Sequence, residues 1–302
     1  MIVKLPVTRE QREWVDSGFE RLDKALGQRR MLNAEVILPT SDYFPEDLDN
    51  SEESVAELFG RICGYMSVDR SRADLEIIPW TEPGNTSTAS AAQDDSLSAE
   101  EAEATRIAAG PHLYNADDTI MSTEGRKTRW LWRNPKPVIE KDPNIRLAHQ
   151  RCFGLEAWED DPTRTIMSIA EYYFDDRLGV ATSFAHHLAH VILIGGGLVD
   201  KAYADMEQLA DLLTIYLGMG IFTANAVVHA YKRISGRGID TEWTKQGSLT
   251  EETCGYALAK FAALRGEEHP MWAEYLSTNV HQYLDRSRQW LLRPYYEDED
   301  EP

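Results

Sequence analysis

Two apolar segments separated by three consecutive glycines constrain the fold of this chain most strongly. Residues 176–194 and 205–217 are each long enough and apolar enough to form a helix that packs in a protein core. The glycines at 195–197 end the first helix and allow the second to fold back antiparallel against it. We therefore expect the second half of the chain to be built around a pair of packed helices.

Histidines and carboxylates recur at helical spacing on this pair. His186 and His190 lie four residues apart, so both imidazoles project from one face of the first helix and can close on a single ion. Glu207 and Asp211 have the same spacing on the second helix, where Glu207 can supply a third ligand. Asp211 then lies one turn away and can accept a hydrogen bond from the second ring nitrogen of a ligating histidine, which would fix the orientation of that ring.

The order of these residues resembles the active-site helix pair of the gluzincin branch of zincin metallopeptidases, over residues 179–216. The segment LGVATSFAHHLAHVILIGG, followed by DMEQLADLLTIYLGMGIF, carries the resemblance. It is more narrowly similar to uncharacterised bacterial zincin-like proteins that have a GYALA helix, here residues 255–259. The resemblance implies an α+β, zincin-like fold with a small N-terminal sheet packed on a predominantly helical second half. It also implies a zinc ion held by His186, His190 and Glu207, with Asp211 as the supporting residue.

One position departs from the family motif His-Glu-x-x-His, whose glutamate is the general base that activates the attacking water. His187 occupies that position here, and Met206 replaces the family's asparagine before the third ligand. Because general-base assistance contributes roughly 10²- to 10⁴-fold to a rate, its loss would cripple peptide hydrolysis without removing the metal. We therefore predict a catalytically impaired or inactive metallopeptidase homologue that binds a peptide or protein.

Two other interpretations stay open at this point. One is an active metal-dependent hydrolase whose base is His187, Glu171 or Glu252. The other is a metal-free helical protein-interaction module, in which the histidines are satisfied polar groups between packed helices and Glu207 pairs with one of them. Asp211 would then simply face solvent. A di-iron site is disfavoured, because the carboxylates that its Glu-x-x-His pattern needs are not spaced for it.

The charge and cysteine content exclude several classes of function. The 302-residue chain has 31 basic and 51 acidic residues, and its net charge of −20 repels phosphate backbones, which argues against nucleic-acid binding. Its 3 cysteines include no Cys-x-x-Cys pair, which disfavours a disulfide framework and a zinc knuckle. The sequence shows no apolar signal-peptide core and no run of about 18 apolar residues. We expect a cytoplasmic protein without a membrane partner.

Composition also divides the chain into parts. Residues 81–105 contain six acidic residues, no basic residue and no aromatic residue, and this composition predicts a flexible acidic linker or insertion. Residues 297–302 predict a disordered acidic tail, because all but the last are acidic. The linker separates an N-terminal α+β part, residues 1–80, from a mostly helical part that carries the metal site, residues 106–296.

Local patterns predict the other elements. Further helices are expected over residues 8–26, 54–66, 221–233, 250–265 and 270–292. Capping-box spacing marks the first of these at Thr8 and Gln11, and the fourth at Ser248 and Glu251. Strands are expected over residues 31–38, 75–78, 119–121 and 129–132, and residues 166–174 fit a strand or a helix.

Overall fold

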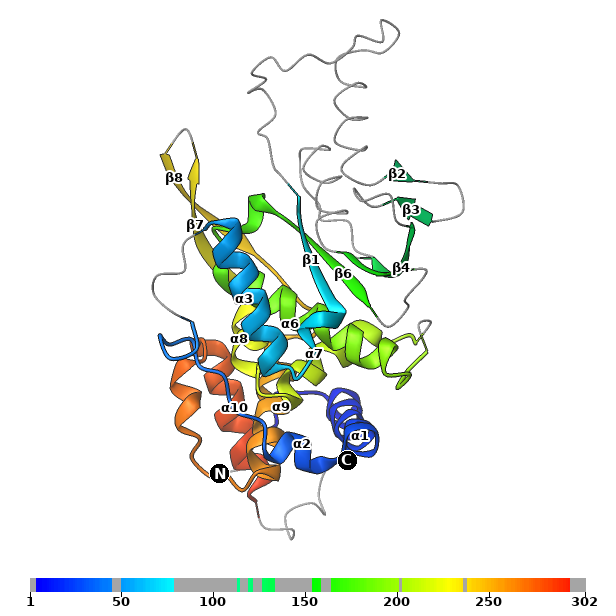
Figure 1. Cartoon of the computed structure of the whole chain (residues 1–302). Helices are drawn as coiled ribbons and strands as arrows, with labels where there is room; N and C mark the ends of the chain where they lie inside the picture. Colours follow the sequence, from blue (N-terminus) through cyan, green and yellow to red (C-terminus); the bar gives the residue numbers. More distant parts are fainter. Residues whose placement is uncertain are drawn as a thin grey trace, which may run out of the picture. The chain divides into compact units, whose positions relative to one another are not determined.

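The computed structural model shows a mixed α+β protein in which helices predominate (Figure 1). It describes residues 4–44, 50–78, 113–114, 119–121, 127–133, 154–158, 164–200, 203–235 and 238–293. The expected linker, 81–105, and the expected tail, 297–302, lie outside these residues.

The chain forms two compact units that alternate along the sequence. The first, called here the helical unit, comprises Met1–Asp49, Leu58–Ser67 and Asp175–Pro302. The second, called the sheet unit, comprises Asn50–Glu57 and Val68–Phe174. The helix expected over residues 54–66 is confirmed as α3 (Glu52–Tyr65), and the boundary between the units falls within it.

The sheet unit contains a six-stranded sheet with the strand order β1-β6-β5-β4-β3-β2. β1 (Ala73–Ile78) and β6 (Thr165–Ala170) form a parallel pair, in register from Ala73 opposite Thr165 to Ile78 opposite Ala170. The other neighbours pair antiparallel. These strands are β2 (Leu113–Tyr114), β3 (Thr119–Met121), β4 (Lys127–Arg133) and β5 (Gly154–Trp158).

This sheet confirms the strands expected over 75–78, 119–121 and 129–132 but corrects the expectation of an N-terminal sheet. Among the described residues up to 80, β1 is the one strand, and the other strands of its sheet come from residues 113–170. The candidate strand over residues 166–174 ends at Ala170, where a 3-10 turn, Glu171–Tyr173, begins.

The strand expected over residues 31–38 is wrong. Met31 lies in a short helix, α2 (Gln28–Leu32), and the residues after it form no strand. The Nη1 group of Arg265 donates hydrogen bonds to three carbonyl oxygens of this stretch, those of Met31, Leu32 and Ala34, at 2.9, 3.2 and 2.7 Å. A side chain from far along the sequence thus satisfies the carbonyls that a neighbouring strand would otherwise bind.

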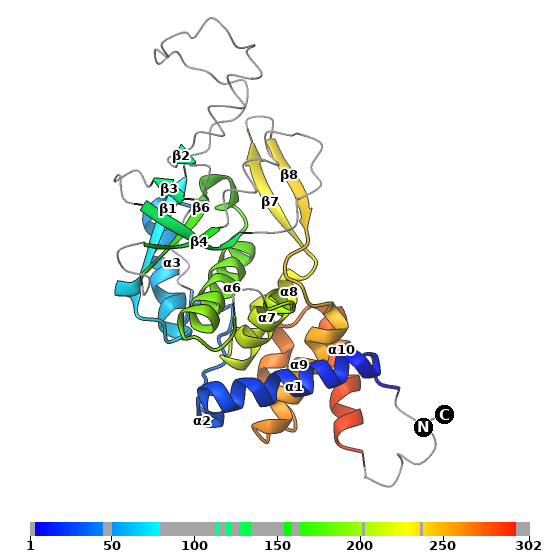
Figure 2. The same ribbon diagram turned by 90° about the vertical axis from the view of Figure 1, so that its right-hand side faces the viewer.

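The helical unit begins with α1 (Arg9–Leu26), as the sequence predicts. Thr8 Oγ1 accepts a hydrogen bond from the backbone N–H of Gln11, and the Gln11 side chain accepts one from the Thr8 N–H. Gly27 ends the helix with a φ of +82°, a value that favours glycine. α1 packs against α7 and α9 (Figure 2), and its buried side chains include Val15, Phe19 and Leu22.

The two helices that constrain the fold are confirmed as α6 (Arg177–Gly195) and α7 (Met206–Tyr216), and they pack against each other. Among the described residues, α6 is the one helix that is long and apolar enough to cross a membrane. It is not an unbroken run of apolar residues, because it also contains polar side chains such as Thr182, Ser183 and His186. Of the most apolar 18 residues of α6, 61% are buried inside the protein.

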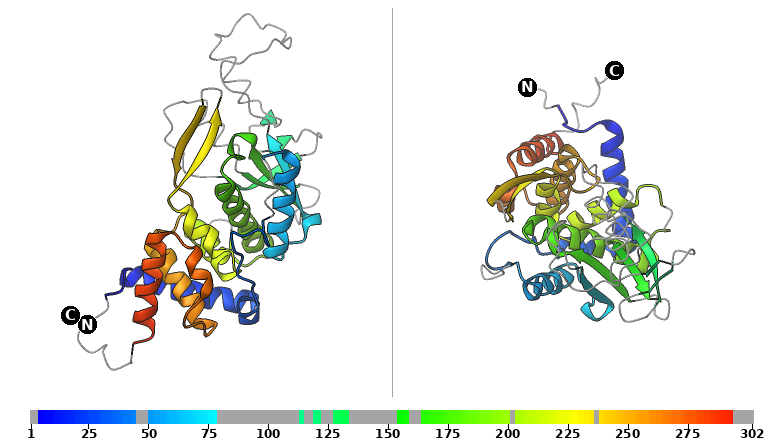
Figure 3. Two further views of the ribbon diagram at one scale, coloured as in Figure 1. Left: turned by 90° about the vertical axis from the view of Figure 1, so that its left-hand side faces the viewer. Right: turned by 90° about the horizontal axis from the view of Figure 1, so that it is seen from above.

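The helix expected over residues 221–233 is wrong after Ala226. α8 (Gly220–Ala226) is followed by β7 (His229–Ser235), which pairs antiparallel with β8 (Gly238–Thr244) to form a hairpin (Figure 3). The sequence carries a signal for this hairpin, because Gly236 and Gly238 separate two short runs with β-branched and aromatic residues.

The C-terminal helices differ from the expected ones at their ends. α9 (Glu251–Leu264) is capped by Thr250, whose Oγ1 accepts a hydrogen bond from the Thr253 N–H, and not by Ser248. The helix expected over residues 270–292 is two elements, a 3-10 helix (Met271–Tyr275) and α10 (Thr278–Leu291).

Asn225 binds the backbone where the last two elements meet. Its side-chain amide donates to the Tyr275 carbonyl at 2.8 Å, and its Oδ1 accepts from the Ser277 N–H at 2.7 Å. The backbone groups that an uninterrupted helix would pair internally are therefore satisfied by a side chain of α8.

Candidate metal centre

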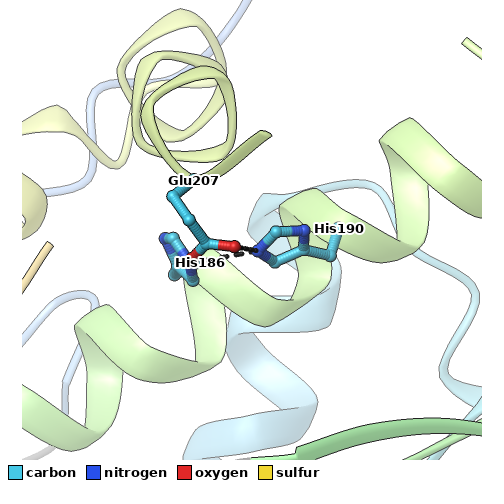
Figure 4. Close-up of side chains that lie close together, drawn as sticks. All are labelled: His186, His190 and Glu207. Atoms are coloured by element: carbon cyan, nitrogen blue, oxygen red, sulfur yellow. Dashed lines mark hydrogen bonds and ion pairs between the residues drawn. The ribbon is translucent and has the colours of Figure 1, made fainter. Parts of the chain in front are cut away.

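The histidines of α6 and the first carboxylate of α7 come together in the helical unit. His186, His190 and Glu207 point toward one another from the two helices (Figure 4), and one ligand atom from each lies within 4.8 Å of the others. We call these three residues the donor group. Among the described residues it is the one set of three or more histidine, cysteine or acidic side chains placed to hold a metal ion.

The distances within the donor group match the size of a zinc site. The two Nε2 atoms lie 3.1 Å apart, and Glu207 Oε2 lies 3.2 Å from His186 Nε2. Glu207 Oε1 lies 3.7 Å from His190 Nε2. A tetrahedral zinc ion with Zn–N bonds of about 2.0–2.1 Å holds its donor atoms about 3.3 Å from one another. The Glu207 carboxylate thus approaches both imidazoles, Oε2 toward His186 and Oε1 toward His190, at separations close to those around a zinc ion.

Asp211 orients the ring of His186. Its Oδ1 lies 2.7 Å from His186 Nδ1, which donates to it, so Nε2 is the ring nitrogen that a metal ion would bind once its proton is lost. Asp211 is 1% exposed, and the possibility that it faces solvent is therefore excluded. Since His186 contacts Asp211 while His190 lies toward Glu207, the two helices run in opposite directions at this contact.

The pKa values of the site reflect close contact between histidines and carboxylates. Burial by itself would lower the pKa of His186, but the charges and hydrogen bonds of Asp211 and Glu207 outweigh it and raise this pKa to about 10. Burial lowers the pKa of His190. For Glu207, burial acts to raise the pKa, but the hydrogen bonds with His186 and His190 prevail and hold it well below its usual range. A protonated His186 is thus the ring that balances the neighbouring carboxylates when no metal ion is bound.

Solvent reaches the donor group from one side. The side chain of His190 is fully buried, whereas those of His186 and Glu207 are 13% and 22% exposed. Glu207 is therefore the most exposed member of the donor group and His190 the most buried.

His187 lies next to the donor group but is not part of it. Its Nδ1 donates to the Ser183 carbonyl at 2.6 Å, one turn back along α6, and its side chain is buried. Burial, together with the neighbouring His186, lowers the pKa of His187 to about 3, so the ring is neutral. His187, at the position where the gluzincin motif has its general base, is thus hydrogen-bonded to the backbone of its own helix.

The two other carboxylates considered as bases also lie outside the donor group. Glu252, in the first turn of α9, accepts hydrogen bonds from its own backbone N–H, from Thr250 and from Tyr283 of α10, and these hydrogen bonds lower its pKa. Glu171 belongs to the sheet unit, in the 3-10 turn after β6.

The sequence reasoning missed three supports of the site. The backbone N–H groups of Ser248 and Leu249 donate to Asp211 Oδ2 at 2.6 and 3.2 Å. His229 binds Asp176, the N-cap of α6, and Trp14 of α1 binds Asp205, the N-cap of α7. These partners are separated by at least 37 residues, and no local motif marks them.

Comparisons of the chain with protein-family models, with curated proteins and with solved structures find no match.

Proposed function

We propose that this chain is a zincin-like, zinc-binding homologue of the gluzincin metallopeptidases whose peptide hydrolysis is impaired or absent. One observation carries the zinc site: His186 Nε2 and His190 Nε2 lie 3.1 Å apart, and the Glu207 carboxylate approaches them with Oε2 at 3.2 Å and Oε1 at 3.7 Å, respectively. The resemblance of residues 179–216 to the gluzincin helix pair supports the relationship to that family.

The donor chemistry favours zinc over harder cations. Imidazole nitrogens suit zinc, whereas magnesium and calcium select oxygen ligands. Asp211 holds His186 in the tautomer whose Nε2 can bind a metal, as outer carboxylates do in many zinc proteins. When bound, a zinc ion would act as a Lewis acid that polarises a carbonyl and makes water more acidic.

The proposed loss of catalysis rests on the surroundings of His187. A general base must lie within hydrogen-bond reach of the proton that it takes. The Nδ1 of His187 is engaged with the Ser183 carbonyl, and its buried side chain is a rigid ring where the family has a longer, flexible carboxylate. A peptide or protein bound beside the metal would therefore be retained and not cleaved.

The setting that we propose for this activity follows from the charge of the chain. A cytoplasmic protein with a net charge of −20 that binds peptides or proteins, and neither nucleic acid nor membranes, fits the composition best. The buried character of α6 agrees with the absence of a membrane partner.

Metal analysis combined with a peptidase assay tests the proposal. Purified protein loaded with zinc and passed through a desalting column should retain one zinc per chain, and the His186→Ala/His190→Ala variant should retain none. His281→Ala is the matched control, because His281 is an exposed histidine on α10. The wild type should show little or no peptidase activity with or without a chelator.

A metal-free alternative is favoured by a different observation. His186 lies within hydrogen-bond distance of Asp211 through Nδ1 and of Glu207 through Nε2, so a doubly protonated ring bridges both carboxylates without an ion. The chain would then be a helical interaction module in which these residues only join α6 to α7. Wild-type protein that retains no zinc would favour this alternative.

A further inference from the structure

Asp211 divides its two carboxylate oxygens between the metal site and a distant loop. Oδ1 accepts from His186 Nδ1 at 2.7 Å, and Oδ2 accepts from the backbone N–H groups of Ser248 and Leu249 at 2.6 and 3.2 Å. The carboxylate is 1% exposed, so these three donors define its position. The loop that contains residues 246–249 joins β8 to α9 and is separated from Asp211 by 37 residues in the sequence.

Gly247 is in close contact with the same carboxylate. A Cβ atom at this position would lie 3.0 Å from Asp211 Oδ2 and 3.6 Å from its Oδ1 and Cγ. Carbon–oxygen contacts are normally no shorter than about 3.3 Å, so the carboxylate would have to shift by a few tenths of an ångström. The absence of a side chain at Gly247 therefore allows the loop to hold Asp211 where it is.

The loop is fixed at both of its ends and cannot easily move to make room. The backbone N–H of Gln246 donates to the Ala226 carbonyl at the end of α8, at 3.1 Å. On the other side, Thr250 caps α9 with its hydroxyl group. Gly247 itself has a φ of +79°, in the region that residues with a side chain rarely adopt.

From these contacts we infer that the 246–249 loop is a positioning element of the metal site, and that Gly247 sets the zinc affinity by letting Ser248 and Leu249 hold Asp211 against His186. This inference rests on the proposed zinc site, but the Asp211–His186 contact that it concerns exists without an ion. A carboxylate displaced toward His186 or away from it would rotate or tilt the imidazole, and Nε2 would leave its place in the donor group. Changes in outer partners of zinc-binding histidines typically cost about 10- to 100-fold in metal affinity.

A matched pair of glycine variants tests the inference. Gly247→Ala introduces the methyl group beside Asp211, and Gly266→Ala introduces it at a glycine with a similar φ of +72°, where nothing lies within 4 Å of the new atom. Both variants carry comparable backbone strain, but only the methyl group at position 247 contacts the Asp211 carboxylate. Gly247→Asn and Gly266→Asn repeat the comparison with a residue that tolerates positive φ better, so the result does not depend on the folding of one variant.

Two measurements on each full-length variant read out the result. The zinc dissociation constant is measured by competition with a chromophoric chelator, and the ring nitrogen signals of His186 are recorded by NMR on metal-free protein with ¹⁵N-labelled histidine. We expect the Gly247 variants to bind zinc about tenfold or more weakly than wild type and to shift the His186 Nδ1 signal. The Gly266 variants should leave both unchanged.

The outcomes separate this inference from the proposed function. If the Gly247 variants keep the wild-type zinc affinity and the wild-type His186 signal, or if the Gly266 variants change both equally, the role of the loop is refuted. If wild-type protein binds no zinc while the His186 signal still moves in the Gly247 variants alone, the proposed zinc site fails and the positioning of His186 by the loop stands.

Discussion

His229 of β7 places its Nε2 atom 2.8 Å from both carboxylate oxygens of Asp176, the residue that caps the start of α6. His229 is 8% exposed and Asp176 is 3% exposed, so the pair is shielded from water. The His229 Nδ1 atom also lies 3.2 Å from the Ala226 carbonyl, at the end of α8. This pair attaches α6, the helix that carries His186 and His190, to the junction between α8 and the hairpin.

Replacement of His229 by alanine should destabilise the protein strongly. It would leave the buried Asp176 carboxylate without its imidazole partner, and removing one partner of a buried hydrogen bond costs about 1–3 kcal/mol. Urea denaturation followed by circular dichroism measures the change. His281→Ala, at a histidine whose side chain is 43% exposed, should change the free energy of unfolding by less than about 0.5 kcal/mol. Equal stability of the two variants would show that the Asp176–His229 pair contributes nothing.

Replacement of His190 by alanine should remove the stabilisation that zinc provides. A ligand that binds only the folded state at 100 times its dissociation constant stabilises that state by about 2.7 kcal/mol. Wild-type protein should therefore melt at a higher temperature with zinc than with chelator, and His190→Ala should melt at the same temperature in both. Differential scanning calorimetry provides the test, and a zinc-dependent rise in the variant would contradict the assignment of His190 as a ligand.

Replacement of His187 by glutamate restores a carboxylate at the general-base position of the family. A carboxylate cannot donate to the Ser183 carbonyl that holds the imidazole, so His187→Glu should gain zinc-dependent cleavage of an unstructured peptide over a wild-type background near zero. Mass spectrometry of the peptide after incubation, with and without chelator, measures it. The decisive contradiction would come from the wild type. If the wild type cleaved the peptide at a rate typical of zinc peptidases, and a chelator abolished that cleavage, His187 would not disable the site.

Tyr216 predicts a loss of stability at alkaline pH. Its hydroxyl group donates to Asp23 at 2.7 Å, and burial together with this hydrogen bond raises its pKa well above 10.0. A pKa that is higher in the folded state favours the neutral phenol there. The contribution of Tyr216 is therefore complete below about pH 10 and is lost as the pH rises further.

The matched variant for this prediction is Tyr216→Phe, which removes the titrating group. Below pH 10 it should be less stable than wild type by about 1 kcal/mol, the typical contribution of one hydrogen bond. Between pH 10 and pH 11.5, urea denaturation should show the wild type losing its advantage over the variant. A difference that stays constant over this interval would refute the role of the phenol.

Several features of this protein were determined by the sequence alone, because they depend on contacts within a few residues. The capping box of Thr8 and Gln11 and the left-handed Gly27 mark both ends of α1. On α6, the four-residue spacing of His186 and His190 places both imidazoles on one face, whatever packs against it. The glycines after α6 predicted where that helix ends.

Other features were decided only by tertiary structure, because the groups that satisfy the backbone come from far along the chain. Residues 31–38 have the apolar content of a strand, but Arg265 binds their carbonyl groups from 231 to 234 residues away. Asn225 likewise separates the 3-10 helix from α10 at a distance of about 50 residues. Around the candidate metal site, residue spacing predicts which side chains share a helix face. The contacts of Asp211 with Gly247, Ser248 and Leu249 could not be predicted in this way, because they depend on the position of a loop more than 30 residues later in the sequence. A hydrogen bond between such distant residues leaves no periodic pattern in the sequence, since its geometry exists only after the intervening helices have packed.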